Sequence, residues 1–224
     1  MSKADLFESL ARTGKALASG KRLELLELLA QGERPVQQLA TVAGLNLTTT
    51  SAHLQLLRDA GLVASRREGT RVLYRLAGPD VAELVTVMFR VAERHRPEVS
   101  AAAAGLTSLP DGVRAIDRTE LLERSHQGEL LVLDVRPSEE YAAGHLPGAV
   151  SIPFDELAGR LEEIPAGAEV AAYCRGRYCV LSYDAVHLLA ERGYTTHLVA
   201  DGVTEFLAHD VALTTSPAPA GGSP

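Results

Sequence analysis

The sequence of 224 residues lacks any long apolar run. No stretch approaches the roughly 18 apolar residues that a membrane-spanning helix needs, so we expect no membrane partner. The first residues, MSKADLFESLARTGKAL, alternate charged and apolar side chains. They contain neither the apolar core nor the small-residue cleavage site of a secretory signal. These absences predict a cytoplasmic protein.

Cysteine is also scarce, because the chain contains only Cys174 and Cys179. Two cysteines in a cytoplasmic chain of this size are too few for a disulfide-stapled scaffold and suggest reactive thiols instead. We therefore expect chemistry near residues 174–179.

The charge differs between the two halves of the chain. Residues 1–99 carry 14 Lys and Arg against 11 Asp and Glu, whereas residues 100–224 carry 8 against 18. An acidic second half repels phosphate, while a locally basic segment in the first half can bind it. The length suits two domains of about 100 residues each, and the 46% apolar content is typical of soluble globular proteins.

The spacing of apolar residues also differs between the two halves of the chain. The first part shows helical spacing interrupted by glycines, whereas short β-rich runs at 130–135 and 169–174 later alternate with helical patterns at 117–125, 155–162 and 179–192. Strands that alternate with helices predict an α/β domain with a mainly parallel sheet. We expect a first domain over 1–98, a linker over 99–112 whose alanine run is compatible with a helix, a second domain over 113–213, and a disordered Pro/Gly/Ser-rich tail over 214–224.

A helix-turn-helix is predicted within the first domain. Residues 36–43 form a short helix, Gly44 turns the chain, and Asn46 can cap a second helix that ends near residue 60. With Thr50, Leu54 and Leu57 facing inward, the opposite face is small and polar and suits the major groove of double-stranded operator DNA. The candidate base- and phosphate-contacting residues on this helix are Thr48, Thr49, Ser51 and Gln55.

A basic hairpin follows this helix directly. Two alternating runs within 62–76 are joined by Glu68-Gly69-Thr70, and we predict DNA contacts for Arg66, Arg67 and Arg71. Such phosphate contacts supply position and affinity rather than sequence choice.

The run SAHLQLLRDAGLVASRREGTRVLYRL resembles the ArsR/SmtB-type repressors, and the resemblance covers about residues 5–98. It implies an α+β winged helix-turn-helix repressor that forms a homodimer through its terminal helices. Many members sense metals, but here the helix VQQLATVAG has no cysteine. The later group of Glu93, His95 and Glu98 has no second histidine nearby, so we expect no metal site and no cofactor.

The second half resembles rhodanese-like domains through the run LLVLDVRPSEEYAAGHLPGAVSIPFDEL and the later AAYCRGRYC. This resemblance covers about residues 113–213 and implies that Cys174 lies in an active loop at the carboxyl end of a strand. Related phosphatases use Cys-x5-Arg, but position 180 here is Val180. The six-residue loop therefore favours sulfur transfer from a sulfane sulfur donor such as thiosulfate or polysulfide.

The loop suggests roles for its neighbours. Arg175 and Arg177 add positive charge that favours the Cys174 thiolate and can hold an anionic donor. Cys179 could attack a persulfide on Cys174, or it could simply begin the next helix as a small residue. Asp134, together with Arg136, could orient the loop or form an ordinary salt bridge at a strand end.

Two functions remain open from the sequence. In the first, the chain is a DNA-binding transcriptional regulator, a repressor, that senses sulfane sulfur or redox state through a persulfide on Cys174. In the alternative, it is a thiosulfate or polysulfide sulfurtransferase that carries a DNA-binding domain. The sequence shows no route from Cys174 to the DNA-binding surface.

Overall fold

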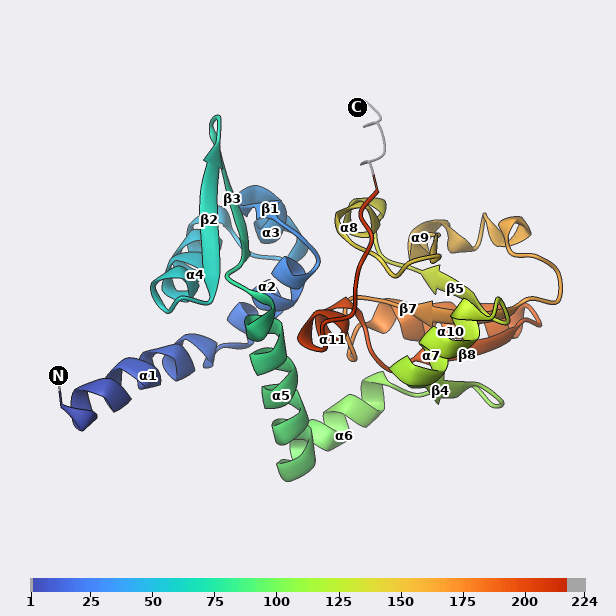
Figure 1. Ribbon diagram of the computed structural model, residues 1–224, viewed down its shortest axis with the longest axis horizontal. Helices are drawn as coiled ribbons and strands as arrows, with labels where there is room; N and C mark the ends of the chain where they lie inside the picture. Colours follow the sequence, from blue (N-terminus) through green and yellow to red (C-terminus); the bar gives the residue numbers. More distant parts are fainter. Residues whose placement is uncertain (1, 217–224) are drawn as a thin grey trace.

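The computed structural model describes residues 2–216 (Figure 1). Its first half contains four helices before the hairpin, then two helices after it. These elements are α1 (Lys3–Leu17), α2 (Gly20–Ala30), β1 (Arg34–Pro35), α3 (Val36–Val42), α4 (Leu47–Asp59), β2 (Val63–Glu68), β3 (Arg71–Leu76), α5 (Pro79–His95) and α6 (Pro97–Leu106). α6 occupies most of the segment that the sequence assigns to a linker.

Local sequence signals explain the helix-turn-helix and the wing. The Asn46 side chain accepts a hydrogen bond from the Thr49 amide, which caps α4 as predicted. Gly44, with φ of 62°, and Gly69, with φ of 59°, allow the two tight turns because glycine tolerates positive φ. β3 pairs with both β1 and β2, so the wing is a three-stranded antiparallel sheet.

The second half is the predicted parallel α/β domain. Its elements are β4 (Arg114–Ile116), α7 (Arg118–His126), β5 (Leu131–Asp134), α8 (Ser138–Ala143), β6 (Val150–Ser151), α9 (Phe154–Leu157), η1 (Leu161–Glu163), β7 (Glu169–Tyr173), α10 (Val180–Glu191), β8 (Thr195–Val199) and α11 (Val203–Ala208). The sheet order is β4-β8-β7-β5-β6, and all its pairs are parallel.

Alternate strand residues build a core on each face of this sheet, as a period of two requires. Leu133 and Ala172 pack with α9 and α10 on one face, while Val132 and Ala171 pack with α7 and α11 on the other. The β-rich runs are buried on both sides, as parallel strands usually are.

Two predictions for this half need correction. The helical pattern at 155–162 does not form one helix, because α9 ends at Leu157 and a separate 3-10 turn follows after Gly159, a poor helix former. Residues 214–216, which the prediction includes in the disordered tail, are held by backbone hydrogen bonds: Thr214 exchanges two with His145, and the Ser216 amide donates to the Ala142 carbonyl. The remainder of the predicted tail, 217–224, lies outside the described residues.

The two halves pack together through helices. α11 lies against α5 and α2, so the first and second halves meet at the carboxyl edge of the parallel sheet (Figure 1). Within residues 2–216, no helix is both long enough and apolar enough to cross a bilayer.

Candidate functional site

The recognition face of α4 follows the predicted pattern. Thr50, Leu54 and Leu57 are fully buried and anchor the helix in the core of the first half. Thr48 and Gln55 are exposed, and Thr49 and Ser51 lie partly exposed beside them. The four candidate DNA-contacting side chains of this helix therefore share one accessible surface.

The wing presents its arginines unequally. Arg67 and Arg71 are exposed near the tip. Arg66 is also exposed, but its guanidinium lies 2.5 Å from Glu33 and 3.0 Å from Glu68. No local pattern in the sequence indicates the contact with Glu33. This residue precedes β1 and meets Arg66 of β2 only once the sheet has folded. Arg66 must exchange these carboxylates for a phosphate in order to bind DNA.

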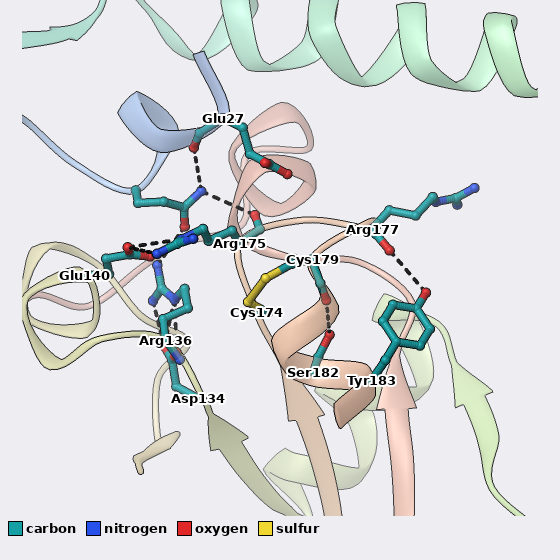
Figure 2. The surroundings of a disulfide bond; sticks show 12 residues. Glu27, Asp134, Arg136, Glu140, Cys174, Arg175, Arg177, Cys179, Ser182 and Tyr183 are labelled. Carbon is teal, nitrogen blue, oxygen red and sulfur yellow. Dashed lines mark hydrogen bonds and ion pairs between the residues drawn. A yellow bond between two sulfur atoms is a disulfide. The ribbon is translucent and has the colours of Figure 1, made fainter. Parts of the chain in front are cut away.

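The active loop is the segment 174–179 between β7 and α10. Its first residue, Cys174, follows β7 directly, where the carboxyl ends of the parallel strands meet (Figure 2). Its sulfur is joined in a disulfide to that of Cys179, the residue that precedes α10. The exposed fractions are only 1% for Cys174 and 9% for Cys179. Cys179 is thus bridged to Cys174 and also occupies the position that begins α10.

The two arginines of the loop are already paired. Arg175 makes two-pronged contacts with Glu140 of α8, the shortest of them 2.6 Å. Arg177 lies 3.2 Å from Glu93 of α5. The backbone amide of Arg177 donates to Glu205, and that of Cys179 donates to the Gly176 carbonyl. In this arrangement, the guanidinium groups that we expected to hold an anionic donor instead hold carboxylates of the chain.

Asp134 and Arg136 form a fully buried ion pair at the end of β5. The Asp134 carboxylate also accepts a 2.6 Å hydrogen bond from the Tyr173 hydroxyl. Burial, followed by the charge of Asp134, raises the pKa of Tyr173 well above its usual value, so this hydroxyl stays a donor. Arg136 in turn donates a 2.9 Å hydrogen bond to Gln31, the residue that follows α2. The pair thus connects the strand end beside Cys174 to the first half of the chain.

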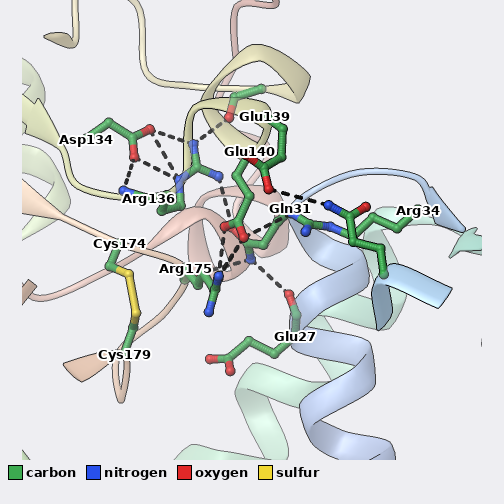
Figure 3. Close-up of polar contacts among 12 residues, drawn as sticks. Glu27, Gln31, Arg34, Asp134, Arg136, Glu139, Glu140, Cys174, Arg175 and Cys179 are labelled. Atoms are coloured by element: carbon green, nitrogen blue, oxygen red, sulfur yellow. Dashed lines mark hydrogen bonds and ion pairs between the residues drawn. A yellow bond between two sulfur atoms is a disulfide. The ribbon is translucent and has the colours of Figure 1, made fainter. Parts of the chain in front are cut away.

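Residues of the first half complete the surroundings of the loop (Figures 2 and 3). The Gln31 side chain, 2% exposed, donates 3.3 Å hydrogen bonds to the Arg175 carbonyl and to Thr204. Arg34 lies 3.0 Å from Glu140, whose carboxylate therefore receives a guanidinium from each half. No spacing along the chain signals these contacts, because more than 100 residues separate the partners.

α5 holds the far side of the loop. Glu93 accepts a 2.9 Å hydrogen bond from the Tyr178 hydroxyl as well as the contact from Arg177, and the rings of Phe89 and Tyr178 lie 5.8 Å apart. Burial and the bond to Glu93 raise the pKa of Tyr178 to about 12. The tyrosine therefore remains a hydrogen-bond donor at neutral pH and acts as a structural contact.

Glu205 is a buried carboxyl at the start of α11. It accepts hydrogen bonds from the Gly202 amide at 2.9 Å and from the Arg177 amide at 3.4 Å. Burial raises its pKa to about 7, although those amide bonds act in the opposite direction. This carboxyl titrates near neutral pH beside the active loop.

Between residues 2 and 216, no three His, Cys, Asp or Glu side chains gather as metal ligands. Glu93, which the sequence analysis considered beside His95 and Glu98, instead contacts Arg177 and Tyr178.

Comparisons with known proteins match both halves. The model of the bacterial regulatory protein, arsR family, matches residues 19–65, and the rhodanese-like domain model matches residues 117–209. The HTH-type transcriptional regulator Rv0324 of Mycobacterium tuberculosis is 51% identical over 204 residues, which cover 91% of this chain and 89% of that protein. This chain belongs to the ArsR family of transcriptional regulators. Its second half is a rhodanese-like domain.

Other relatives match a smaller part of the chain. A probable mercury resistance operon repressor of Streptomyces lividans is 38% identical over 35% of this chain and 62% of its own length. A solution structure from Mycobacterium bovis, described as a homodimeric winged helix-turn-helix domain, is 55% identical. It covers 43% of this chain and 91% of its own, with a TM-score of 0.40.

Replacing Gly202 with alanine is expected to disrupt the active loop. A Cβ at this position would lie 2.5 Å from the Gly176 Cα and 2.6 Å from the Arg175 carbonyl carbon, and backbone cannot move aside as a flexible side chain can. We expect Gly202→Ala to lose roughly 1–3 kcal/mol of stability in denaturant unfolding. Gly105→Ala, which meets no atom within 4 Å, is the control and should match the wild type or exceed it by up to about 1 kcal/mol, because Gly105 lies in α6 and alanine favours a helix. Equal stability of the two variants would contradict the tight packing.

Replacing Glu205 with glutamine is expected to flatten the pH dependence of stability. A carboxyl whose pKa is raised in the folded state stabilises fully below its unfolded value of 4.5, and this contribution is lost as pH rises through about 7. The melting temperature of the wild type should therefore fall relative to that of Glu205→Gln between pH 5 and pH 8. Exposed Glu83, changed to Gln, is the control. Parallel curves for the wild type and Glu205→Gln would refute the assignment.

Proposed function

We propose that this ArsR-family regulator is a homodimeric repressor that senses sulfane sulfur through Cys174 and changes its affinity for operator DNA in response. The observation that carries the proposal is the position of the active loop. It contains both cysteines, and each residue between them adjoins the winged helix-turn-helix half, which binds DNA in this family.

The DNA-binding surface follows from α4 and the wing. Thr48 and Gln55 would enter the major groove with Thr49 and Ser51 beside them. Arg67 and Arg71 would contact phosphates, joined by Arg66 once it leaves Glu33.

The dimer contact would lie on α1 and α5. Both helices expose large apolar side chains. Monomeric soluble proteins rarely expose large contiguous apolar patches, so such side chains favour a contact with another chain. These residues are Leu6, Phe7 and Leu10 on α1 and Leu84 and Val91 on α5. Because the opposite side of α5 holds the active loop, the same helix would belong to both the dimer contact and the sulfur site.

The proposed chemistry has two steps. The Cys174 thiolate attacks a sulfur atom of a polysulfide, the S–S bond of the donor breaks, and Cys174 becomes a persulfide while the rest of the donor leaves as hydrosulfide or a shorter polysulfide. The Cys179 thiolate then attacks the Cys174 sulfur, which forms the disulfide and releases hydrosulfide. The two thiols are oxidised, and the sulfane sulfur is reduced.

The contacts of the loop supply a route to the DNA-binding half. Two bonded sulfurs come closer than two unbonded ones can, so opening the disulfide or adding a sulfur to Cys174 must displace atoms in a close-packed interior. Because Cys174 directly follows β7, the displacement would fall on the loop and on its contacts with Gln31, which follows α2, and with Glu93 of α5. A coupling of about 1–3 kcal/mol, typical of allosteric proteins, would change DNA affinity by roughly 5- to 150-fold.

The deciding experiment measures the affinity of the reduced dimer, in which the Cys174–Cys179 disulfide has been opened, for DNA upstream of its own gene at fixed salt, before and after polysulfide treatment. We expect a shift of at least fivefold for the wild type and none for Cys174→Ser. Unchanged affinity together with turnover of a sulfur donor would refute the sensor and support the sulfurtransferase. An equal shift for Cys174→Ser would exclude Cys174 as the sensing residue.

Glu93→Gln tests the route. Glutamine keeps the size of the side chain but loses the ionic contact with Arg177, so the polysulfide response should shrink toward onefold while untreated DNA affinity stays near the wild-type value. Disulfide formation, followed by mass spectrometry, should persist. Glu83→Gln on the same helix is the control and should respond as the wild type does. A full response in Glu93→Gln would exclude this contact as the route.

A further inference from the structure

Two carboxylates converge on the active loop at Gly176. A Cβ built on Gly176 would lie 3.0 Å from Glu27 Oε1 and 3.4 Å from Glu205 Oε2. Glu205 comes from α11 of the rhodanese-like half, whereas Glu27 comes from α2 of the winged half. Figure 3 shows Glu27 extending from α2 toward the loop that carries the disulfide. The winged half therefore places a carboxyl group beside the loop that carries both cysteines.

The attraction of Arg175 for Glu27 only partly offsets these charges, because burial outweighs it. Arg175 is paired with Glu140 at 2.6 Å, and Arg177 is paired with Glu93 at 3.2 Å. The Arg177 amide, which could otherwise bind an anion, donates to Glu205. An anionic donor that approaches Gly176 would therefore face two carboxyl groups, Glu27 and Glu205. The two nearby guanidinium groups are already paired with other carboxylates.

Burial strengthens this repulsion. Glu205 is 5% exposed, Cys174 is 1% exposed, and Glu27 is partly buried. Burial raises the pKa of both carboxyls, so both lie where water solvates charge poorly. Charges in such a region are screened less by water than charges on the surface.

We propose that Glu27, a residue of the winged half, determines which sulfur donors reach Cys174. It disfavours dianionic donors such as thiosulfate relative to donors with one charge or none, such as the hydrogen disulfide anion. This inference rests on the proposed sulfur chemistry of Cys174 and adds the class of donor. It assigns to the winged half a part in the specificity of the rhodanese-like half.

The first test compares donors on the reduced full-length chain at pH 8, where Glu205 is ionised. The rate of Cys174 persulfide or disulfide formation is measured with thiosulfate, which would leave sulfite, and with sodium disulfide, which would leave hydrosulfide. Thiosulfate carries one more negative charge than the hydrogen disulfide anion. Two unit charges about 4 Å apart interact by about 1 kcal/mol even in water, which corresponds to a roughly fivefold change in the ratio of the two rates. We therefore expect Glu27→Gln to raise the ratio of the thiosulfate rate to the disulfide rate about fivefold or more.

Glu83→Gln is the matched control, because it removes an exposed carboxylate of the winged half away from the loop. It should leave the ratio of rates within twofold of the wild type. An unchanged ratio in Glu27→Gln, or an equal rise in Glu83→Gln, overturns the assignment.

A second test does not depend on sulfur chemistry. Iodoacetamide and iodoacetate have similar size and differ in charge, so the ratio of their alkylation rates at Cys174, measured by peptide mass, reports the repulsion directly. Glu27→Gln should raise the iodoacetate-to-iodoacetamide ratio about fivefold. If neither sulfur donor modifies Cys174 but this ratio rises, the proposed function fails and the role of Glu27 stands. If the ratio does not rise, or neither reagent reaches Cys174, the role of Glu27 is refuted.

Discussion

The Glu140 carboxylate is fully buried between the two halves of the chain and receives Arg34 from one half and Arg175 from the other. A buried charge is tolerated only when it is paired and hydrogen-bonded, and loss of one partner leaves an uncompensated charge in the interior. The pairing therefore requires the winged half to stay docked on the active loop. Gln31, which joins Arg136 to the Arg175 carbonyl, satisfies further buried polar groups at the same boundary.

This boundary gives the active loop an unusual environment. In a free rhodanese-like domain, a loop at the carboxyl edge of the sheet would face solvent, where ligands of open α/β sheets bind. Here the loop faces α2 and α5, and its two arginines hold Glu140 and Glu93. Cys174 is consequently enclosed by both halves. The same enclosure places Glu27 beside the active loop.

Much of each half could be predicted from sequence because local rules specify it. Asn46 caps α4, Thr50 and Leu54 face the core, and Gly69 turns the wing, each through interactions within a few residues. The pattern at 155–162 failed because helical periodicity does not register a break at Gly159. Arg175 and Arg177 were identified as loop cations, but the carboxylates that hold them were not.

The sequence by itself determined the two fold classes, the family, the recognition helix and the position of Cys174. Hydrophobic period, capping and loop length are encoded over short stretches of chain, so they can be read without coordinates. Only the tertiary structure decided that Cys174 is bonded to Cys179, that Arg66 is held by Glu33, and that α2 and α5 enclose the active loop. Those contacts join residues far apart in the chain, and their energies depend on burial and on charges that no local pattern records.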